Sequence, residues 1–385
     1  MHWLSEAFFY SIPFLLIFTL IVFIHELGHF WAARKSGIMV KTFSIGIGPE
    51  IYGYTDARNT RWRISLVPLG GYVMMEGDTE DGEDSADAPK RDDTGVSSHP
   101  LSSGNLFEKS PWQRFWVSVS GPLCNYLLAV VLLGGIYSAV GRSESSLLVS
   151  ETLETSPATA AGLLPGDVIT HINETPVATF RELRQALHKG LPNTPITIRL
   201  LREEESIQKS LIPTYTEKKN IFGRPIPIFS MGVLLAEGEV RSLSILSTLW
   251  YSLKDVGIMS ADMAMALGGI FTGTQPVGNL GGPIRIAEMA GTISKSGSLP
   301  HILLFIVTLS VNLGLVNLFP FPGLDGGTAM VCVFEGVLRR PLSKRVREVI
   351  GYCGFVMIGM LMLLGLGNDL LQLPVLQKIW NFLGL

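Results

Sequence analysis

FLLIFTLIVFIHELGH, residues 14–29, joins an apolar run to two histidines and a glutamate. His25 and His29 are four residues apart, so a helix places both imidazoles on one face, where they can reach a single Zn²⁺. Glu26 projects about 100° away from His25, close enough to accept a proton from water that the metal activates. Ionisable side chains in an apolar segment of membrane length are costly and usually functional. The stretch therefore predicts a zinc-binding helix in a membrane rather than a soluble amphipathic helix with two core histidines.

The composition of the whole chain supports a membrane protein. Of its 385 residues, 47% are apolar and 16% are charged, whereas soluble proteins have about 25% charged residues. This balance is typical of a polytopic membrane protein with a soluble part. The net charge of −3 gives no argument for a nucleic-acid partner. The N-terminus lacks a basic region and a small-residue cleavage site, so we expect the first apolar segment to remain as an anchor.

Apolar runs along the chain predict four transmembrane helices, each long enough for a ~30 Å hydrocarbon core. They lie within residues 1–35, 112–140, 299–348 and 349–367. Basic residues follow the first segment but do not precede it. The positive-inside rule then places the N-terminus outside and the HELGH motif at the cytoplasmic leaflet. Residues 339–347 are basic in the same way, so the tail, 368–385, is also expected to be extracytoplasmic.

The third segment delivers a candidate third metal ligand. Its apolar run, 299–319, is followed by two prolines that break a helix at the cytoplasmic leaflet, and Asp325 comes next. Asp325 thus reaches the depth inferred for the two histidines, and we expect it to bind the metal rather than only to form an Asp-Gly turn. Residues 241–271 carry charges in mid-segment and are expected to form an amphipathic helix on the outer surface. A crossing there would move Asp325 to the opposite leaflet.

The two segments between the first and second crossings differ in character. Residues 36–75 alternate polar and apolar side chains, with glycines suited to turns. We expect a small sheet on the cytoplasmic side, with strands at 41–49, 61–67 and 70–75. Two roles remain open for this sheet: its edge can bind an extended peptide, or it only packs on the membrane face. Residues 76–111 are acidic and predict a flexible cytoplasmic loop.

Residues 143–214 have the charge density of a soluble domain. Four strand-like runs surround one helix, at about 179–189, and AAGLLPGDVI, residues 160–169, resembles the signature of bacterial PDZ domains. That resemblance implies an extracytoplasmic α+β domain with a peptide-binding groove or a size filter. Residues 215–298 are expected to form a linker and amphipathic surface helices. In the second crossing, Asn125 either holds another helix or orients substrate or metal ligands, and the residues favour the first role.

Four motifs in this order resemble the site-2 protease family, and most closely the bacterial regulator-of-sigma-E protease type. They are HELGH in the first membrane segment, Ser-Gly-Pro-x-x-Asn at 120–125, the PDZ insert, and NLFPFPGLDGG at 317–327. The resemblance implies that zinc is bound by His25, His29 and Asp325. It also implies that Glu26 is the general base, that Asn317 holds substrate, and that the β region presents substrate as an added strand. The β-region residues in question are Phe43, Gly46, Gly48, Pro49, Gly70, Gly71 and Tyr72.

By this resemblance the chain is expected to be an intramembrane zinc endopeptidase, multi-pass in the bacterial inner (plasma) membrane. It would hydrolyse a peptide bond within or near the transmembrane segment of a single-span protein, in regulated intramembrane proteolysis. The implied substrates are an anti-sigma factor already trimmed by a site-1 protease, or remnant signal peptides. The PDZ domain would bind a peptide or a substrate ectodomain, although many members carry two tandem copies and one is found here. Two alternatives remain: a non-catalytic PDZ scaffold in the membrane, and a membrane zinc protease for soluble peptides.

Overall fold

The computed structural model describes residues 2–77, 104–143, 147–188, 193–219, 225–236, 238, 240–274 and 282–372. Most of the expected acidic loop (78–103) and most of the expected tail (373–385) lie outside these residues. The chain divides into two compact units. Unit 1 comprises Met1–Leu133, Leu253–Ser260 and Gly281–Leu385, and unit 2 comprises Gly134–Ser252 and Ala261–Leu280.

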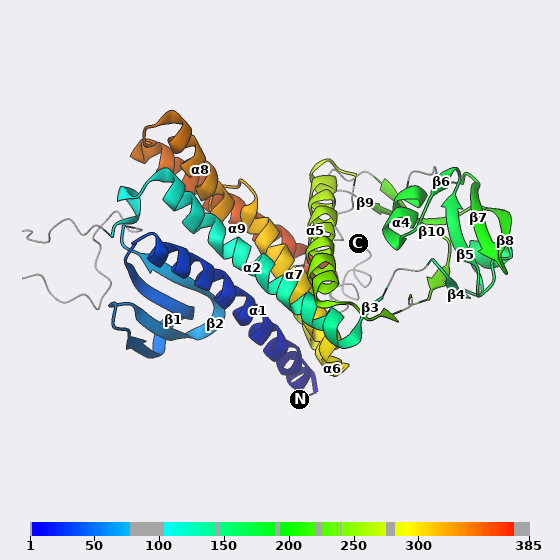
Figure 1. Cartoon of the computed structure of the whole chain (residues 1–385), viewed down its shortest axis with the longest axis horizontal. Helices are drawn as coiled ribbons and strands as arrows, with labels where there is room; N and C mark the ends of the chain where they lie inside the picture. The colour runs from blue at the N-terminus through cyan, green and yellow to red at the C-terminus, as the bar shows by residue number, and fades with distance from the viewer. Residues whose placement is uncertain are drawn as a thin grey trace, which may run out of the picture. The chain divides into compact units, whose positions relative to one another are not determined.

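Unit 1 combines long helices with a small sheet (Figure 1). Its helices are α1 (His2–Lys35), α2 (Pro111–Val140, whose last turns belong to unit 2), α6 (Pro283–Lys295), α7 (Leu299–Leu318), α8 (Asp325–Leu338) and α9 (Lys344–Gln372). A 3-10 turn, η1 (Leu106–Glu108), precedes α2. Helix α1 packs against α6 and α7. The apolar core at this contact includes Ile17, Ile21, Ala290, Phe305 and Ile306.

Among the described residues, three helical segments are long and apolar enough to cross a membrane: Ser11–Lys35, Pro111–Val140 and Leu299–Leu318. They confirm the first three expected crossings as apolar helices of sufficient length. The fourth expected crossing, 349–367, falls in α9, several of whose side chains lie outside the described set, and it stays a prediction. Residues 241–271 contain α5 (Ile245–Phe271), which is not among these three segments. Its location on the outer membrane surface also stays a prediction.

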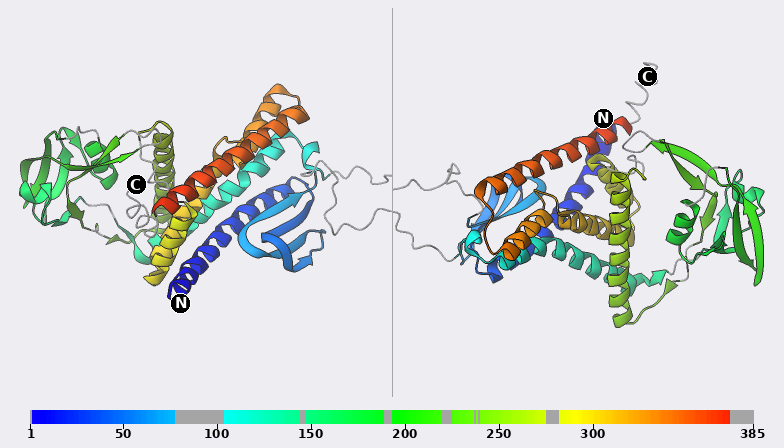
Figure 2. Two further views of the ribbon diagram at one scale, coloured as in Figure 1. Left: turned by 180° about the vertical axis from the view of Figure 1, so that it is seen from behind. Right: turned by 90° about the horizontal axis from the view of Figure 1, so that it is seen from above.

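The predicted sheet is present and lies against α1 (Figure 2). It consists of β1 (Val40–Thr55) and β2 (Arg61–Met75), and β2 joins the second and third expected strands in one. Register partners place residues 42–45 of β1 between two parts of β2, namely residues 61–64 and residues 71–74. The Thr19 hydroxyl donates a hydrogen bond of 2.9 Å to the Pro68 carbonyl. The turn within β2 therefore reaches the middle of the apolar span of α1.

Unit 2 contains the expected α+β elements. A four-stranded sheet has the order β6-β5-β7-β8. Its strands are β5 (Val168–Ile172), β6 (Thr175–Pro176), β7 (Ile196–Arg202) and β8 (Glu205–Leu211), and α4 (Phe180–His188) lies near the predicted position. The remaining short elements are β3 (Arg142–Ser143), β4 (Val149–Thr152), α3 (Pro157–Ala160), β9 (Thr214–Lys219), β10 (Pro225–Ser230), β11 (Val233–Leu235) and β12 (Val240–Arg241). The core extends past residue 214, because Phe229 and Met231 belong to it and β11 pairs with β4.

Candidate metal centre

Three potential ligands converge where α1 and α8 meet. The Nε2 atoms of His25 and His29 lie 3.2 Å apart. Asp325 Oδ2 lies 3.0 Å from Nε2 of His25 and 3.4 Å from Nε2 of His29. A tetrahedral zinc site with metal–ligand bonds of ~2.0–2.2 Å needs ligand atoms about 3.3–3.5 Å apart. The donor set and its spacing therefore fit Zn²⁺, and both histidines are buried.

The turn between α7 and α8 explains how Asp325 reaches the histidines. Helix α7 ends at Leu318, and the prolines that follow cannot continue it. A Cβ atom on Gly326 would lie 2.3 Å from the Leu318 carbonyl oxygen, and one on Gly327 would lie 2.1 Å from the carbonyl oxygen of Phe321. Only glycines allow the chain to fold back this tightly. Asp325 then begins α8, so the Asp-Gly-Gly sequence serves both the turn and the ligand.

The second nitrogen of each imidazole has a partner on α2. His29 Nδ1 lies 2.8 Å from the Val117 carbonyl oxygen, which can only accept a hydrogen bond. His29 therefore carries its proton on Nδ1 and leaves the Nε2 lone pair for a metal. His25 Nδ1 lies 3.2 Å from the side-chain amide of Asn125, which is fully buried. Sequence reasoning favoured a helix-packing role for Asn125, and the structure places it against a candidate ligand.

Glu26 lies between the histidines and the sheet. The backbone N–H of Val73 lies close to its carboxylate. A Cβ atom on Gly71 would lie 3.5 Å from Cγ of Glu26, so β2 passes directly over this side chain. Glu26 also lines the same cavity as His25 and His29. The carboxylate is thus oriented by the strand beside the candidate metal ligands.

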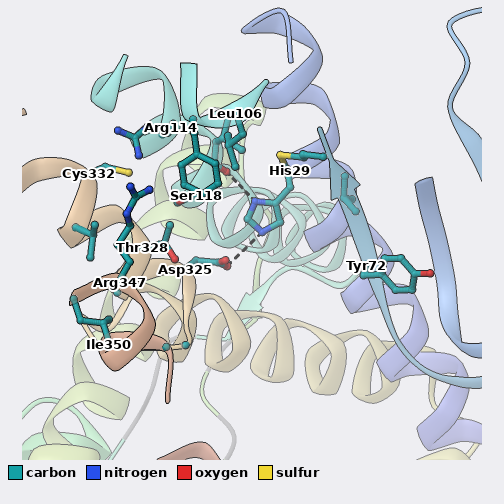
Figure 3. A pocket seen from close by; sticks show the side chains of 18 of the residues that line it. His29, Tyr72, Leu106, Arg114, Ser118, Asp325, Thr328, Cys332, Arg347 and Ile350 are labelled. Atoms are coloured by element: carbon teal, nitrogen blue, oxygen red, sulfur yellow. Dashed lines mark hydrogen bonds and ion pairs between the residues drawn. The ribbon is translucent and has the colours of Figure 1, made fainter. Parts of the chain in front are cut away.

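The candidate ligands open into a cavity of about 660 Å³ (Figure 3). Its lining comes from α1, β2, η1, α2, the turn before α8, α8 and α9. The lining residues include His25, Glu26, His29, Tyr72, Val73, Met75, Leu106, Phe107, Arg114, Val117, Ser118, Asp325, Thr328, Val331, Cys332, Arg347 and Ile350. The volume falls within the range of about 300–1,000 Å³ typical of ligand pockets.

The structure separates the residues that the family resemblance implicated in substrate binding. Tyr72 lines the cavity, and the Asn317 amide lies 3.4 Å from Nε2 of His25. Phe43 is fully buried, and its ring packs on Phe30 and Trp62. The structure does not bring the following residues to the cavity lining: Phe43, Gly46, Gly48, Pro49, Gly70 and Gly71.

Several residues that line the cavity were not identified from the sequence. Val73 and Met75 have no chemical signature beyond their alternation with buried neighbours, and Val117 contributes a backbone carbonyl to His29. Arg347 was interpreted only through the charge of its loop, and Arg114 was not singled out. Their contact with the cavity depends on how α2 and α9 pack, which local patterns do not encode.

Comparisons with known proteins identify the family of this chain. The model of peptidase family M50 matches residues 13–362. The chain belongs to peptidase family M50, the site-2 proteases. It is a zinc-dependent metalloprotease of the membrane.

Relatives cover almost the full length of this M50 protease. A protein of Agrobacterium fabrum, provisionally named a zinc metalloprotease, is 34% identical over 371 residues, covering 94% of this chain and 96% of its own. A protein of Rhizobium meliloti with the same kind of name is 35% identical over 370 residues, covering 94% and 96%. Metalloprotease MmpA of Caulobacter vibrioides is 29% identical over 390 residues, covering 96% and 97%.

Two solved PDZ domains are similar to a part of this M50 protease. The PDZ domain of an SdrC-like protein of Listeria monocytogenes is 19% identical, covers 24% of this chain and 88% of its own, and has a TM-score of 0.19. Its counterpart from Listeria innocua is 20% identical, covers 25% and 100%, and has the same TM-score of 0.19. A TM-score of 0.19 does not establish a shared fold. The PDZ assignment of residues 143–214 therefore stays a prediction.

Proposed function

We propose that this zinc metalloprotease hydrolyses a peptide bond within or near the transmembrane segment of single-span membrane proteins. The observation that carries the proposal is the position of the three candidate ligands. His25 and His29 are buried in the apolar segment Ser11–Lys35, and Asp325 joins them from the turn after another apolar helix. A site for soluble peptides alone has no need of ionisable side chains inside such a helix, where they are costly.

The side chains of the site have distinct roles in this reaction. His25, His29 and Asp325 would hold zinc, which would supply Lewis acidity toward a peptide carbonyl and water. Glu26 takes a proton from the attacking water and passes it to the leaving nitrogen. Glu26 and Val73 line the same cavity, and the Val73 N–H lies close to the Glu26 carboxylate. Asn317, beside His25, is within reach of a substrate carbonyl at the same point.

The strand at the cavity explains how a helical substrate is held. Peptide bonds in a helix are hidden by hydrogen bonds, and an unwound segment in an apolar environment needs new partners. Residues 71–75 of β2 pair with β1 on one side, and Tyr72, Val73 and Met75 line the cavity. An unwound substrate segment that adds to this edge regains backbone hydrogen bonds without sequence preference. The β region thus presents substrate through Tyr72, Val73 and Met75 rather than through Phe43.

The family resemblance is the basis for proposing the membrane topology, the role of the PDZ domain and the substrates. The protein has four crossings in a bacterial inner membrane, with both termini extracytoplasmic and the site toward the cytoplasmic leaflet. Residues 143–214 form a PDZ domain that binds a peptide or a substrate ectodomain. The substrates are anti-sigma factors already trimmed by a site-1 protease, or remnant signal peptides. The basic residues after α1 and between α8 and α9 support this orientation.

The test combines zinc content with cleavage of a reporter that has one transmembrane span. Glu26→Gln should keep zinc and lose cleavage, whereas Asp325→Ala should lower the zinc content. Glu154→Gln, an exposed glutamate of unit 2, is the matched control and should behave as wild type. Equal cleavage by wild type and Glu26→Gln would contradict the role of Glu26. Efficient cleavage of the same sequence without its span would favour a protease for soluble peptides.

A further inference from the structure

The cavity has a second charged end, away from the sheet. Arg114, in the first turns of α2, and Arg347, in the first turn of α9, both line it. Figure 3 shows the two guanidinium groups on one side of the cavity and Tyr72 on the opposite side, with His29 and Asp325 between them in this view. The Phe107 ring lies beneath both, 6.0 Å from Cζ of Arg114 and 5.0 Å from Cζ of Arg347.

The charge of Arg114 is already compensated. Its Nη2 lies 2.5 Å from Oε2 of Glu335, and these two side chains are 11% and 1% exposed. The second oxygen of Glu335 accepts a hydrogen bond of 2.8 Å from the Leu342 N–H. Both oxygens of this carboxylate are therefore engaged, and among the described residues its ion pair is with Arg114.

Arg347 is the uncompensated charge at this end of the cavity. Within the described part of the chain, its guanidinium has no ion-pair partner, and its Nε is buried without a hydrogen bond. The Nε of Arg114 is buried and unpaired as well. An unsatisfied buried donor is costly, more so on a charged group. Two arginines that line one cavity and keep an unpaired Nε donor form a site suited to an anion.

We propose that Arg347, supported by Arg114, binds a carboxylate side chain of the substrate. This inference rests on the proposed function, because the arginines and the candidate zinc ligands share one cavity. The planar fork of a guanidinium matches a carboxylate with two parallel hydrogen bonds. A substrate segment that lies along Tyr72 and passes the metal ligands then reaches the arginine end. The protease accordingly selects substrates with an Asp or Glu near the scissile bond, on the side away from the β2 edge.

The test uses single-span reporters that differ at one position. Asp is compared with Asn, and Glu with Gln, at each of several positions on either side of the cleavage site. Wild type should cleave the acidic reporter at one of these positions about tenfold or more faster, in kcat/KM, than its amide partner. This comparison needs no enzyme variant and carries no folding risk.

Enzyme variants assign the preference to Arg347. Arg347→Gln should reduce the acid-to-amide ratio to near one while cleavage of the amide reporter persists. Arg347→Glu should shift the preference to a reporter with Lys at the same position. Arg345→Gln, an exposed arginine in the same turn that does not line the cavity, is the matched control and should keep the wild-type ratio.

The outcomes separate this inference from the proposed function. Cleavage without any acid-to-amide difference, or a difference that survives in Arg347→Gln, overturns the carboxylate site and leaves the protease assignment standing. A rate that depends on Arg347 and on anionic lipid in the vesicles, but not on the reporter, assigns the arginines to a lipid phosphate and also overturns it. A zinc-loaded enzyme that cleaves no reporter overturns the proposed function, and the substrate site with it.

Discussion

The side-chain amide of Asn125 lies 3.2 Å from Nδ1 of His25, across the contact between α2 and α1. Metal binding through Nε2 of His25 leaves the proton on Nδ1, so the atom of Asn125 that faces it must be an acceptor. Oδ1 of Asn125 is buried without a hydrogen-bond partner. A half-turn of the amide brings this oxygen to Nδ1 and satisfies both groups. Asn125 thereby selects the tautomer of His25 that binds zinc.

Replacing Asn125 should weaken zinc binding. Asn125→Ala removes the acceptor for His25 Nδ1, and we expect the zinc affinity to fall about 10- to 100-fold. Asn125→Asp keeps an acceptor and should retain most of the affinity. Competition with a chelator measures both values. Asn312→Ala, at a half-buried asparagine of α7, is the control for loss of a polar side chain inside the unit. An unchanged zinc affinity in Asn125→Ala would mean that Asn125 only packs helices together.

Gly121 leaves the space that His29 occupies. A Cβ atom at this position would lie 2.3 Å from Nε2 of His29, the nitrogen expected to bind zinc. Gly121→Ala should therefore displace the imidazole and lower both zinc content and cleavage. Gly135→Ala in the same helix is the matched control, because a Cβ there meets no atom within 4 Å. Equal zinc content in the two variants would show that the imidazole moves without cost.

The candidate ligands could be predicted because each depends on a short-range rule. A spacing of four residues places His25 and His29 on one helix face whatever surrounds the helix. Prolines end α7 wherever it packs, and a membrane restricts the depth at which Asp325 emerges. Together these rules predict how deep in the membrane each side chain lies. They brought His25, His29 and Asp325 together without knowledge of how the helices pack.

The cavity could not be predicted, because it depends on packing between distant segments. The alternation in β1 does not say which face meets the core. The family resemblance implied a substrate contact for Phe43, and the structure places this side chain in the core of unit 1. His29 hydrogen-bonds to the carbonyl of Val117, 88 residues away in the chain. Every residue has a backbone carbonyl, so the sequence does not indicate which one is the partner. For Arg347 the residue type indicated only which side of the membrane is basic. Its place at the cavity follows from the packing of α9.

Removing only one partner of the ion pair between Arg114 and Glu335 should be strongly destabilising. Glu335 is almost fully buried, and its removal leaves the Arg114 charge without compensation. Glu335→Gln should lower the free energy of unfolding by about 3–5 kcal/mol, the usual cost of breaking a buried pair. The double variant Arg114→Met with Glu335→Leu should recover much of this loss, because no buried charge is then left unpaired. Thermal and denaturant unfolding in detergent measure these differences.

An exposed pair provides the control for this prediction. Arg61 and Glu50 form an ion pair in which the side chains are 45% and 28% exposed. Glu50→Gln should change the free energy of unfolding by about 1 kcal/mol or less. A cost for Glu335→Gln as small as that for Glu50→Gln would mean that water reaches the Arg114 pair.

Asp167 should make unit 2 sensitive to acid. Burial by itself raises the pKa of this carboxyl, but hydrogen bonds from Arg202 and from the Leu164 N–H outweigh it and hold the pKa below its usual range. A lowered pKa in the folded state stabilises the fold above the unfolded pKa of about 3.9. This stability is lost as the pH falls from there through the folded pKa.

Hydrogen exchange of the β5 and β7 amides, corrected for the intrinsic effect of pH, measures this loss. Between pH 6 and the unfolded pKa the wild-type exchange should stay constant, and below about 4 it should accelerate, by up to tenfold for each unit of pKa lowering. Asp167→Asn should show faster exchange at neutral pH and a weaker dependence on acid, because it cannot ionise. Glu151→Gln, an exposed carboxylate of β4, should follow the wild-type curve. A wild-type profile that stays flat below pH 4 would mean that the Asp167–Arg202 pair does not stabilise this unit.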